Sequence, residues 1–235
     1  SLYMYLAVPS VALLGLTPLA ARLPSALAGL ATLLLVYRLV REEHGRTAGV
    51  LAAALLAVSP WHVLMSRTGY DWNLLPALST LTVVLALRCL RGACSSLWPG
   101  LAAAASFYSY APLRLLVPLL LAGLLALHWR DVRRRGRALL PGAALAFAGA
   151  LPVLFSLTVG AASRLETIGD GGDGAAGFAR RYAAAFEPRF YLAGARGPEL
   201  HRLRSTGLLY GFEVPLLAAG VASVLLRRQQ SGLVL

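Results

Sequence analysis

The side chains best suited to chemistry gather in one short stretch, residues 59–73, which lies between two long apolar runs. This stretch contains Arg67, Tyr70, Asp71 and the only asparagine of the sequence, Asn73. A carboxylate can accept a proton from an attacking hydroxyl group, and the planar guanidinium of arginine binds anions through paired hydrogen bonds. Polar groups are costly in so apolar a chain and often mark function. We therefore interpret the stretch as the rim of an active site at a membrane surface.

Further candidates lie outside this stretch. They are Tyr108, Tyr110 and Arg114 in the middle of the chain, Arg22 before an apolar run, and His201 in a long polar segment. Each also has a simpler explanation. Tyrosines form aromatic belts at membrane interfaces, arginines at helix ends extend to the membrane surface, and a single loop histidine is commonly only solvated. The sequence leaves both interpretations open.

Composition indicates a membrane protein built from helices. Of the 235 residues, 58% are hydrophobic and only 14% are charged. Several runs of about 18 residues carry no charge, which is the length that crosses a hydrocarbon core of ~30 Å. We therefore predict an all-α fold, a polytopic bundle of about seven transmembrane spans preceded by an interfacial helix.

The net charge of +12 comes from arginine, since the sequence has no lysine. The arginines lie mostly beside the apolar runs, which is typical of membrane topology signals rather than of nucleic-acid binding. The glycine-rich run at 169–174 is acidic and would repel phosphate, and the HExxH metal motif is absent from the sequence, which excludes a soluble nucleotide-dependent enzyme. The two cysteines, Cys89 and Cys94, form no CxxC motif or Cys/His cluster and predict neither a zinc site nor a redox pair.

The apolar runs predict the positions of the helices. An interfacial helix is expected over residues 2–16. The predicted spans are 23–40, 47–65, 72–90, two within 97–127, 139–158 and 208–226. Pro112 disfavours a helical conformation at the residue before it, so we expect a sharp turn there between the two spans of 97–127.

Arginine positions predict which ends of the spans face the cytoplasm, because basic loops are retained on that side. The loops concerned are 38–46, 88–92, 130–137 and the pair Arg227–Arg228. The opposite, extracytoplasmic face then carries a loop at 159–206 together with all of the candidate residues. We therefore expect residues far apart in the sequence to converge in one extracytoplasmic site.

The order of several motifs resembles that of a known enzyme family. The N-terminal "LYMYL" is followed by "ARLPSALAGL" (21–30), "ALLAVSPWHVLMSR" (54–67) and "FYSYAPLRLLVPLL" (107–120). The series ends with "FEPRFYLAG" (186–194) and "LHRLRSTGLLYGFEVPLLAAG" (200–220). Over nearly the whole chain this order resembles the GT-C membrane glycosyltransferases, in the branch of protein O-mannosyltransferases and aminoarabinose transferases.

The resemblance implies a function and a set of partners. Such enzymes transfer a sugar from a polyprenyl-phosphate donor in the membrane to a protein, lipid or glycan acceptor on the extracytoplasmic face. The implied location is the inner (plasma) membrane, and the lysine-free composition points to a bacterium. In the family, the catalytic aspartate precedes the segment matching Leu2–Leu16. We therefore expect a single domain, 1–235, that is incomplete at both ends and whose main base lies upstream of Ser1.

The same resemblance assigns roles to the candidate residues. The donor phosphate-binding candidates are Arg22, Arg67 and Arg114. The substrate-binding candidates are Tyr70, Tyr108, Tyr110 and His201. Asp71 is the catalytic candidate, as a contact to the sugar or a metal or as a partner of the missing base; alternatively it pairs with Arg67 or caps the next helix. Residues 17–18 and 194–198 depart from the family pattern, so no cofactor is assigned and a divalent metal stays open.

A transporter or lipid flippase for an anionic substrate is the alternative function, because arginines at a membrane rim could also guide such a substrate. A non-catalytic membrane scaffold is a third interpretation. Transporters commonly contain paired repeats and helices that are broken near the membrane midplane. The sequence shows neither pattern, and its polar candidates gather at one predicted face, so the glycosyltransferase is preferred.

Overall fold

The computed structural model describes residues 1–169 and 210–232, together with positions 177 and 183. Every regular element in this described part is a helix, as the sequence predicts. Contacts divide the chain into two compact units. The first comprises Ser1–Ala57 and Met65–Asp170, and the second comprises Val58–Leu64 and Gly171–Leu235. The single domain expected from the sequence stays a prediction.

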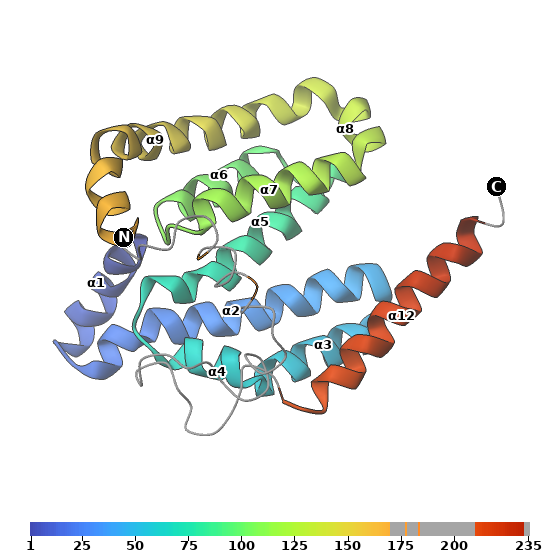
Figure 1. Ribbon diagram of the computed structural model, residues 1–235, viewed down its shortest axis with the longest axis horizontal. Coiled ribbons are helices and arrows are strands. Elements are labelled where there is room, and N and C mark those ends of the chain that lie inside the picture. Colours follow the sequence, from blue (N-terminus) through green and yellow to red (C-terminus); the bar gives the residue numbers. More distant parts are fainter. Residues whose placement is uncertain (170–176, 178–182, 184–209, 233–235) are drawn as a thin grey trace. The chain divides into compact units, whose positions relative to one another are not determined.

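The chain begins with two helices, and a local capping signal sets the start of the second (Figure 1). α1 (Leu2–Leu14) occupies most of the segment predicted to form the interfacial helix. α2 (Pro18–His44) begins where the Thr17 side chain accepts a hydrogen bond from Ala20 N at 3.2 Å. Proline at the first helical position adds to this signal, because it needs no amide hydrogen there and its φ angle already suits a helix.

α2 is longer than the predicted span, 23–40, and the prediction of a charged loop over 38–46 is wrong. The helix continues through the charged residues to His44 and ends at Gly45, whose φ of 90° is a conformation that glycine adopts readily. Arginine and glutamate are good helix formers, so these residues extend the helix instead of ending it.

The second predicted span, 47–65, is divided into two helices. α3 (Arg46–Val58) and α4 (Pro60–Arg67) are bent by 63° at the break between them. Pro60 cannot donate a helical hydrogen bond, and its ring disfavours a helical conformation at Ser59. The proline that the sequence places in the last turns of one span therefore separates two helices.

The helix predicted over 72–90 is confirmed. A short 3-10 helix, η1 (Asp71–Asn73), leads directly into α5 (Leu74–Leu90), and the two form an apolar helix of 20 residues.

α5 lies parallel to α2 within the first unit (Figure 1). Near the beginnings of the two helices, Asn73 Nδ2 donates a hydrogen bond to Ser25 Oγ at 2.8 Å. At their far ends, Arg91 forms ion pairs with Glu42, at 3.4 Å, and with Glu43. The two helices are therefore held in register at both ends.

The apolar stretch 97–127 forms two helices with a turn at Pro112, as predicted. α6 (Leu97–Phe107) and α7 (Leu113–Leu127) run in opposite directions on either side of this turn (Figure 1). At 1.5 Å per residue they are only about 16 and 22 Å long. Neither reaches across a ~30 Å hydrocarbon core alone, so the two predicted spans are not confirmed as spans.

The predicted basic loop, 130–137, is also helical. It forms α8 (Trp129–Arg135) and the beginning of a 3-10 helix, η2 (Gly136–Leu139). As at the end of α2, a run of arginines is compatible with a helix, and α8 ends at a glycine, Gly136, whose φ is 39°.

The last helix of the first unit, α9 (Leu140–Gly169), extends beyond its predicted end at residue 158. Residues 159–169 of the expected 159–206 loop are therefore helical. Most of the remainder of that loop lies outside the described residues.

Small residues let α6 and α9 pack closely. A Cβ atom added at Gly100 would overlap the backbone of Gly142, and one added at Gly142 would overlap the carbonyl of Ser96. Farther along the pair, a Cβ added at Gly149 would lie 2.6 Å from the Cβ of Ala104. Close approach through small residues about one turn apart is typical of helix pairs in membranes.

In the second unit, α12 (Glu213–Gly232) begins later than the span predicted over 208–226. The buried carboxylate of Glu213 accepts a hydrogen bond from Tyr210 N at 3.0 Å. A negative charge is favourable in the first turn of a helix, so Glu213 starts this helix instead of lying inside a span.

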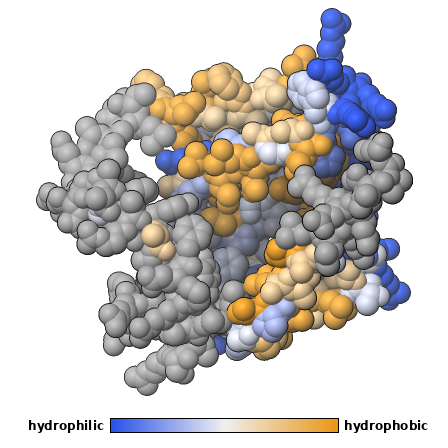
Figure 2. Space-filling model, turned by 45° about the vertical axis from the view of Figure 1, so that its right-hand side comes forward, coloured by the Kyte–Doolittle hydropathy of each residue, from blue (hydrophilic) through white to orange (hydrophobic). Residues whose placement is uncertain are grey.

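Three described helices are long and apolar enough to cross a membrane, and the bent α3–α4 pair is a fourth if it counts as one span. The three are Pro18–His44, Asp71–Leu90 and Trp129–Phe155. Hydrophobic residues cover much of the middle of the visible face in Figure 2, and hydrophilic residues gather at its right-hand edge. These features support a helical membrane protein, whereas the count of about seven spans is not confirmed.

Candidate functional site

A buried polar network, which we call the Asn73 cluster, attaches the candidate loop to the neighbouring helices. The cluster consists of Tyr3, Ser25, Thr68 and Asn73. Asn73 is only 4% exposed, and its Nδ2 donates to Ser25 Oγ at 2.8 Å and to the backbone carbonyl of Thr68. The Tyr3 hydroxyl lies 2.8 Å from Ser25 Oγ and donates to Ala21 O at 2.6 Å. The network thereby joins α1, α2 and the loop that precedes α5.

The turn between α6 and α7 lies next to the same loop. Leu2 N donates a hydrogen bond to Tyr108 O at 2.8 Å, which attaches the beginning of α1 to the turn. The buried Ser109 donates from Oγ to the backbone carbonyl of Asp71 at 3.5 Å. Three segments that are far apart in the sequence therefore meet at one end of the first unit.

Arg114 stabilises this turn from its position at the beginning of α7. Its Nε donates to Phe107 O at 3.2 Å, so the side chain connects the two helices across the turn. The side chain is half-buried, and no acid lies within ion-pair distance of it in the described part of the chain. No carboxylate of the described part therefore neutralises the positive charge of this guanidinium.

Arg67 and Asp71 do not form the ion pair considered from the sequence. α4 ends at Arg67 and the chain turns before Asp71 begins η1, so the two residues do not share one helix face. Among the residues that the structure describes, the only ion pairs are those of Arg91 with Glu42 and Glu43. Arg67 is exposed and Asp71 is half-buried.

Asp71 is not a helix cap either. Tyr70 occupies the N-cap position of η1 and Asn73 that of α5. Asp71 is the first residue of η1, where the partial positive charge of a helix N-terminus favours a carboxylate. Within the described residues its side chain has no hydrogen-bond or ion-pair partner.

The remaining candidates surround these segments. Arg22 is exposed in the first turns of α2. Tyr70 is exposed and its ring centroid lies 4.8 Å from that of Trp72. Tyr108 is exposed in the turn, whereas Tyr110 is partly buried against the α6–α7 core. The structure thus brings together the segments that carry these residues, while their convergence on one cavity stays a prediction.

His201 lies outside the described residues. In the described part, no group of three or more histidine, cysteine, aspartate or glutamate side chains is arranged to hold a metal ion. Whether the protein binds a divalent metal therefore stays open, as it does from the sequence.

An apolar groove of about 430 Å³ lies beside the Asn73 cluster, between α1, α2 and the beginning of α5. Its lining includes Leu6, Leu13, Leu23, Leu27, Ala31 and Leu74. Ser10 is the only lining side chain with a polar atom, and its Oγ donates to Ala20 O at 2.7 Å. The groove has the size of a small-molecule site and offers hydrocarbon surface to a ligand.

Residues 2–155 match the family model described as dolichyl-phosphate-mannose-protein mannosyltransferase. The chain belongs to this family. It is therefore a membrane glycosyltransferase of the GT-C type, as the motif order in the sequence predicts. No curated protein and no solved structure matches the chain.

The region shared with these mannosyltransferases includes every candidate residue except His201. It also includes positioning residues to which sequence reasoning gave no role, namely Tyr3, Ser25 and Ser109. Asn73 was conspicuous as the only asparagine, and a buried amide must find hydrogen-bond partners. Its partner Ser25 could not be named, because it lies on another helix, 48 residues away.

Proposed function

We propose that this protein transfers a sugar from a polyprenyl-phosphate donor to an acceptor on the extracytoplasmic face of a bacterial inner membrane. The observation that carries the proposal is the meeting of the Asp71 loop, the beginning of α1 and the Arg114 turn beside an apolar groove. A lipid-linked sugar needs hydrocarbon surface for its tail, cations for its phosphate and polar groups for its sugar. The family's name points to mannose as the sugar and protein as the acceptor, with lipid or glycan acceptors as alternatives.

The donor is proposed to bind with its prenyl chain in the groove and its phosphate at the nearby arginines. Arg22 directly precedes Leu23, which lines the groove, so a phosphate at the end of the prenyl chain would lie close to this guanidinium. Arg67 and Arg114 come from the two other converging regions, and neither is neutralised by an acid among the described residues. Tyr70, Tyr108 and the more distant candidates are assigned to the sugar and the acceptor.

In the proposed reaction, an acceptor oxygen attacks the anomeric carbon of the sugar, and the bond from that carbon to the phosphate oxygen breaks. The electron pair of this bond leaves with the phosphate, and the arginines stabilise its growing negative charge. The acceptor proton passes to a carboxylate. Arginines suit this role, because a guanidinium stays charged and can donate two hydrogen bonds to one phosphate.

Among the acids of the first unit whose side chains the structure describes, only Asp71 lies at this end. Glu42 and Glu43 are paired with Arg91 at the far end of α2, and Asp131 lies beyond the far end of α7. We assign Asp71 a contact with the sugar or the acceptor, and we expect the main base to be another carboxylate, outside residues 1–235. The 235-residue chain alone should then bind the donor without transferring its sugar.

A transporter or flippase is the second candidate, and one observation favours it. The 63° bend between α3 and α4 is the kind of interruption that transporters use near a substrate. The two functions differ in the fate of the sugar, which a transferase attaches covalently to an acceptor and a transporter moves unchanged across the membrane.

The proposal is tested by reconstituting the protein, in its full-length form, in lipid vesicles with a radiolabelled mannosyl-phosphoryl-polyprenol. Peptide, lipid and glycan acceptors are supplied outside. Covalent labelling of one acceptor class, lost in the Arg67→Ala variant, is the expected result. Unmodified donor crossing the vesicle membrane without labelled acceptor would favour the transporter. Transfer by the 235-residue chain that disappears in Asp71→Asn would contradict the assignment of the main base to another carboxylate.

A further inference from the structure

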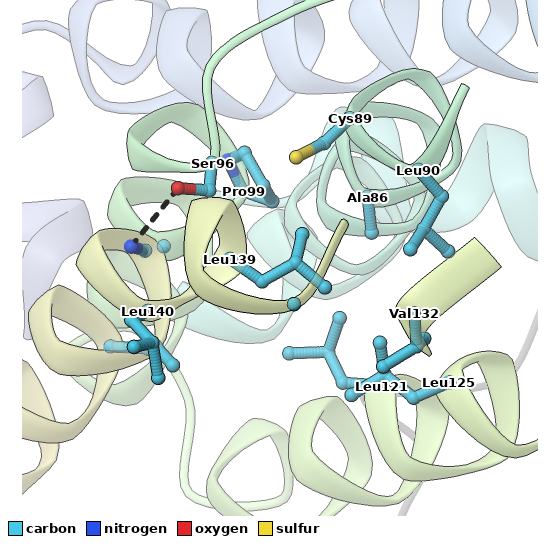
Figure 3. A pocket seen from close by; sticks show the side chains of 15 residues that line it. Ala86, Cys89, Leu90, Ser96, Pro99, Leu121, Leu125, Val132, Leu139 and Leu140 are labelled. Carbon is cyan, nitrogen blue, oxygen red and sulfur yellow. Dashed lines mark hydrogen bonds between the residues drawn. The ribbon is translucent and has the colours of Figure 1, made fainter. Parts of the chain in front are cut away.

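A second apolar cavity lies at the opposite ends of the helices from the Asn73 cluster. It has a volume of about 330 Å³, opens to the surface, and is lined by residues of α5, α6, α7, α8, η2 and α9 (Figure 3). Its walls include Leu90, Pro99, Leu121, Leu125, Leu139 and Leu140. The only lining side chains with a polar atom are those of Cys89 and Ser96, and Ser96 Oγ already accepts a hydrogen bond from Gly142 N at 3.2 Å. The cavity is therefore suited to hydrocarbon.

A run of arginines borders this cavity. Val132 and Gly136, from α8 and η2, belong to its lining, and the segment around them contains five arginines and one acid, Asp131. Arg135 is used inside the protein, since its Nε donates to Leu90 O at 2.9 Å. The other four are exposed and have no ion-pair partner among the described residues; they are Arg130, Arg133, Arg134 and Arg137. Positive charge therefore borders the apolar cavity on the side of α8 and η2.

Trp129 indicates the level of this segment in a membrane. Its side chain is 53% exposed, and the Arg133 guanidinium carbon lies 5.0 Å from the centroid of its ring. Tryptophan and arginine together are typical of the headgroup level of a bilayer, where an aromatic ring is half in hydrocarbon and a cation meets phosphate. A ligand that enters the cavity from this level would have its polar end beside the exposed arginines.

We infer that the cavity binds an anionic phospholipid, with an acyl chain in the cavity and the phosphate on the exposed arginines of α8 and η2. The apolar lining selects hydrocarbon, and the net positive charge of the segment selects an anionic headgroup over a zwitterionic one. Cys89 is separated from Asp71 by about 27 Å along η1 and α5, so this lipid site is separate from the proposed donor site. The inference holds whichever substrate the transferase uses.

The headgroup half of the inference is tested by native mass spectrometry of the purified protein, titrated with phosphatidylglycerol or with phosphatidylcholine of the same acyl chains. Phosphatidylglycerol should bind roughly tenfold more tightly, or better, since each arginine near a headgroup contributes on the order of 1 kcal/mol. The triple variant R133Q/R134Q/R137Q should lose this preference. The matched variant R38Q/R41Q/R46Q, which removes the same charge from exposed positions on α2 and α3, should keep it. If the two variants lost the preference for phosphatidylglycerol equally, the lipid would be attracted by the positive surface in general, and the proposed site would be wrong.

The cavity half is tested with a neighbouring pair of exposed alanines on α9. Ala143 lines the cavity and Ala144 does not. Ala143→Trp should fill the space and weaken binding of both phospholipids, whereas Ala144→Trp should leave it unchanged. An unaffected Ala143→Trp would place the acyl chain elsewhere and overturn the inference. Displacement of phosphatidylglycerol by millimolar inorganic phosphate would likewise show that the arginines bind free phosphate and that the cavity contributes nothing.

Discussion

At the residue scale, the position of the candidate loop depends most on Asn73. Its amide joins Ser25 of α2 to the backbone of Thr68, and Ser25 in turn contacts the Tyr3 hydroxyl. A buried polar network of this kind is specific because each member has one geometry that satisfies its hydrogen bonds. The charged and aromatic candidates around it are more exposed than Asn73.

Asn73→Ala should lower the free energy of unfolding by roughly 1–3 kcal/mol, because the buried hydroxyl of Ser25 and the partly buried carbonyl of Thr68 would lose their donor. Thermal unfolding of the detergent-solubilised protein measures this change. Ser79→Ala is the control, since the Ser79 hydroxyl bonds only to carbonyls of its own helix, with Leu75 O at 2.7 Å. Similar shifts for the two variants would show that the network has no special role.

Arg67→Ala should reduce the rate of sugar transfer by ~10²–10³-fold, the typical effect of removing an electrostatic contact to a leaving group. Arg67→Lys should retain part of the rate, because a point charge remains while the paired hydrogen bonds of the guanidinium are lost. Arg38→Ala, an exposed arginine near the other end of α2, is the control for a loss of surface charge. Equal and small effects at Arg67 and Arg38 would indicate that Arg67 only extends to the membrane surface.

Some of this site could be predicted at the level of single residues, and some could not. The apolar context of Asp71, Arg67 and Asn73 is visible in the sequence, because these polar residues lie between two long apolar segments. The absence of an Arg67–Asp71 ion pair could not be predicted, because it depends on the helix ending at Arg67 and not one turn later. Contacts such as Ser109 to Asp71 depend on how whole helices fold back, which no local pattern contains.

At the scale of elements, the small residues between α6 and α9 are the clearest packing device. Gly142→Ala should destabilise the protein by roughly 1–3 kcal/mol, because the added methyl group would overlap the Ser96 carbonyl and push the helices apart. Gly123→Ala on α7 is the matched control, since an added Cβ there meets nothing within 4 Å. It should be neutral or stabilising, because alanine favours a helix more than glycine does.

Unfolding in detergent, followed by circular dichroism, compares the two glycine variants directly. If the Gly142→Ala protein were as stable as the Gly123→Ala protein, α6 and α9 could move apart without a loss of stability.

Helix boundaries could be predicted from the sequence where a single proline or glycine determines the local backbone conformation. Pro112 separates α6 from α7 as expected, and the third predicted span is a continuous helix. Charged residues were a poorer guide. Arginine and glutamate end a transmembrane span but do not end a helix, so α2 continues to Gly45 and the basic loop near residue 130 is helical.

At the scale of the whole molecule, the orientation in the membrane is the main open prediction. Ala138 follows the arginine-rich α8 and Ala111 lies in the turn beside the candidate site, and both are exposed. In a background with Cys89 and Cys94 replaced, Ala111→Cys should react with an impermeant maleimide added outside intact cells, and Ala138→Cys should react only after lysis. The reverse pattern would place the candidate site in the cytoplasm.

The number of spans shows why the global arrangement is harder to predict than its parts. Hydropathy and length identify apolar segments, and α2, α5 and the helix through residues 129–155 meet both criteria. α6 and α7 are equally apolar but short. Whether a short helix crosses a bilayer depends on what covers its ends and on the local bilayer thickness, and neither property is encoded in the segment itself.

Because α2 and α5 are attached to each other at both ends, neither helix can slide along the other, and the length of the pair is fixed. An axial shift of one helix against the other would break the Asn73–Ser25 bond at one end and the Arg91 ion pairs at the other. A change in bilayer thickness must then be absorbed by tilting the pair as a whole, which moves the Asp71 loop relative to the lipid headgroups. Transfer rates in vesicles of increasing acyl length should therefore pass through a maximum, and freeing one end with Arg91→Ala should broaden it.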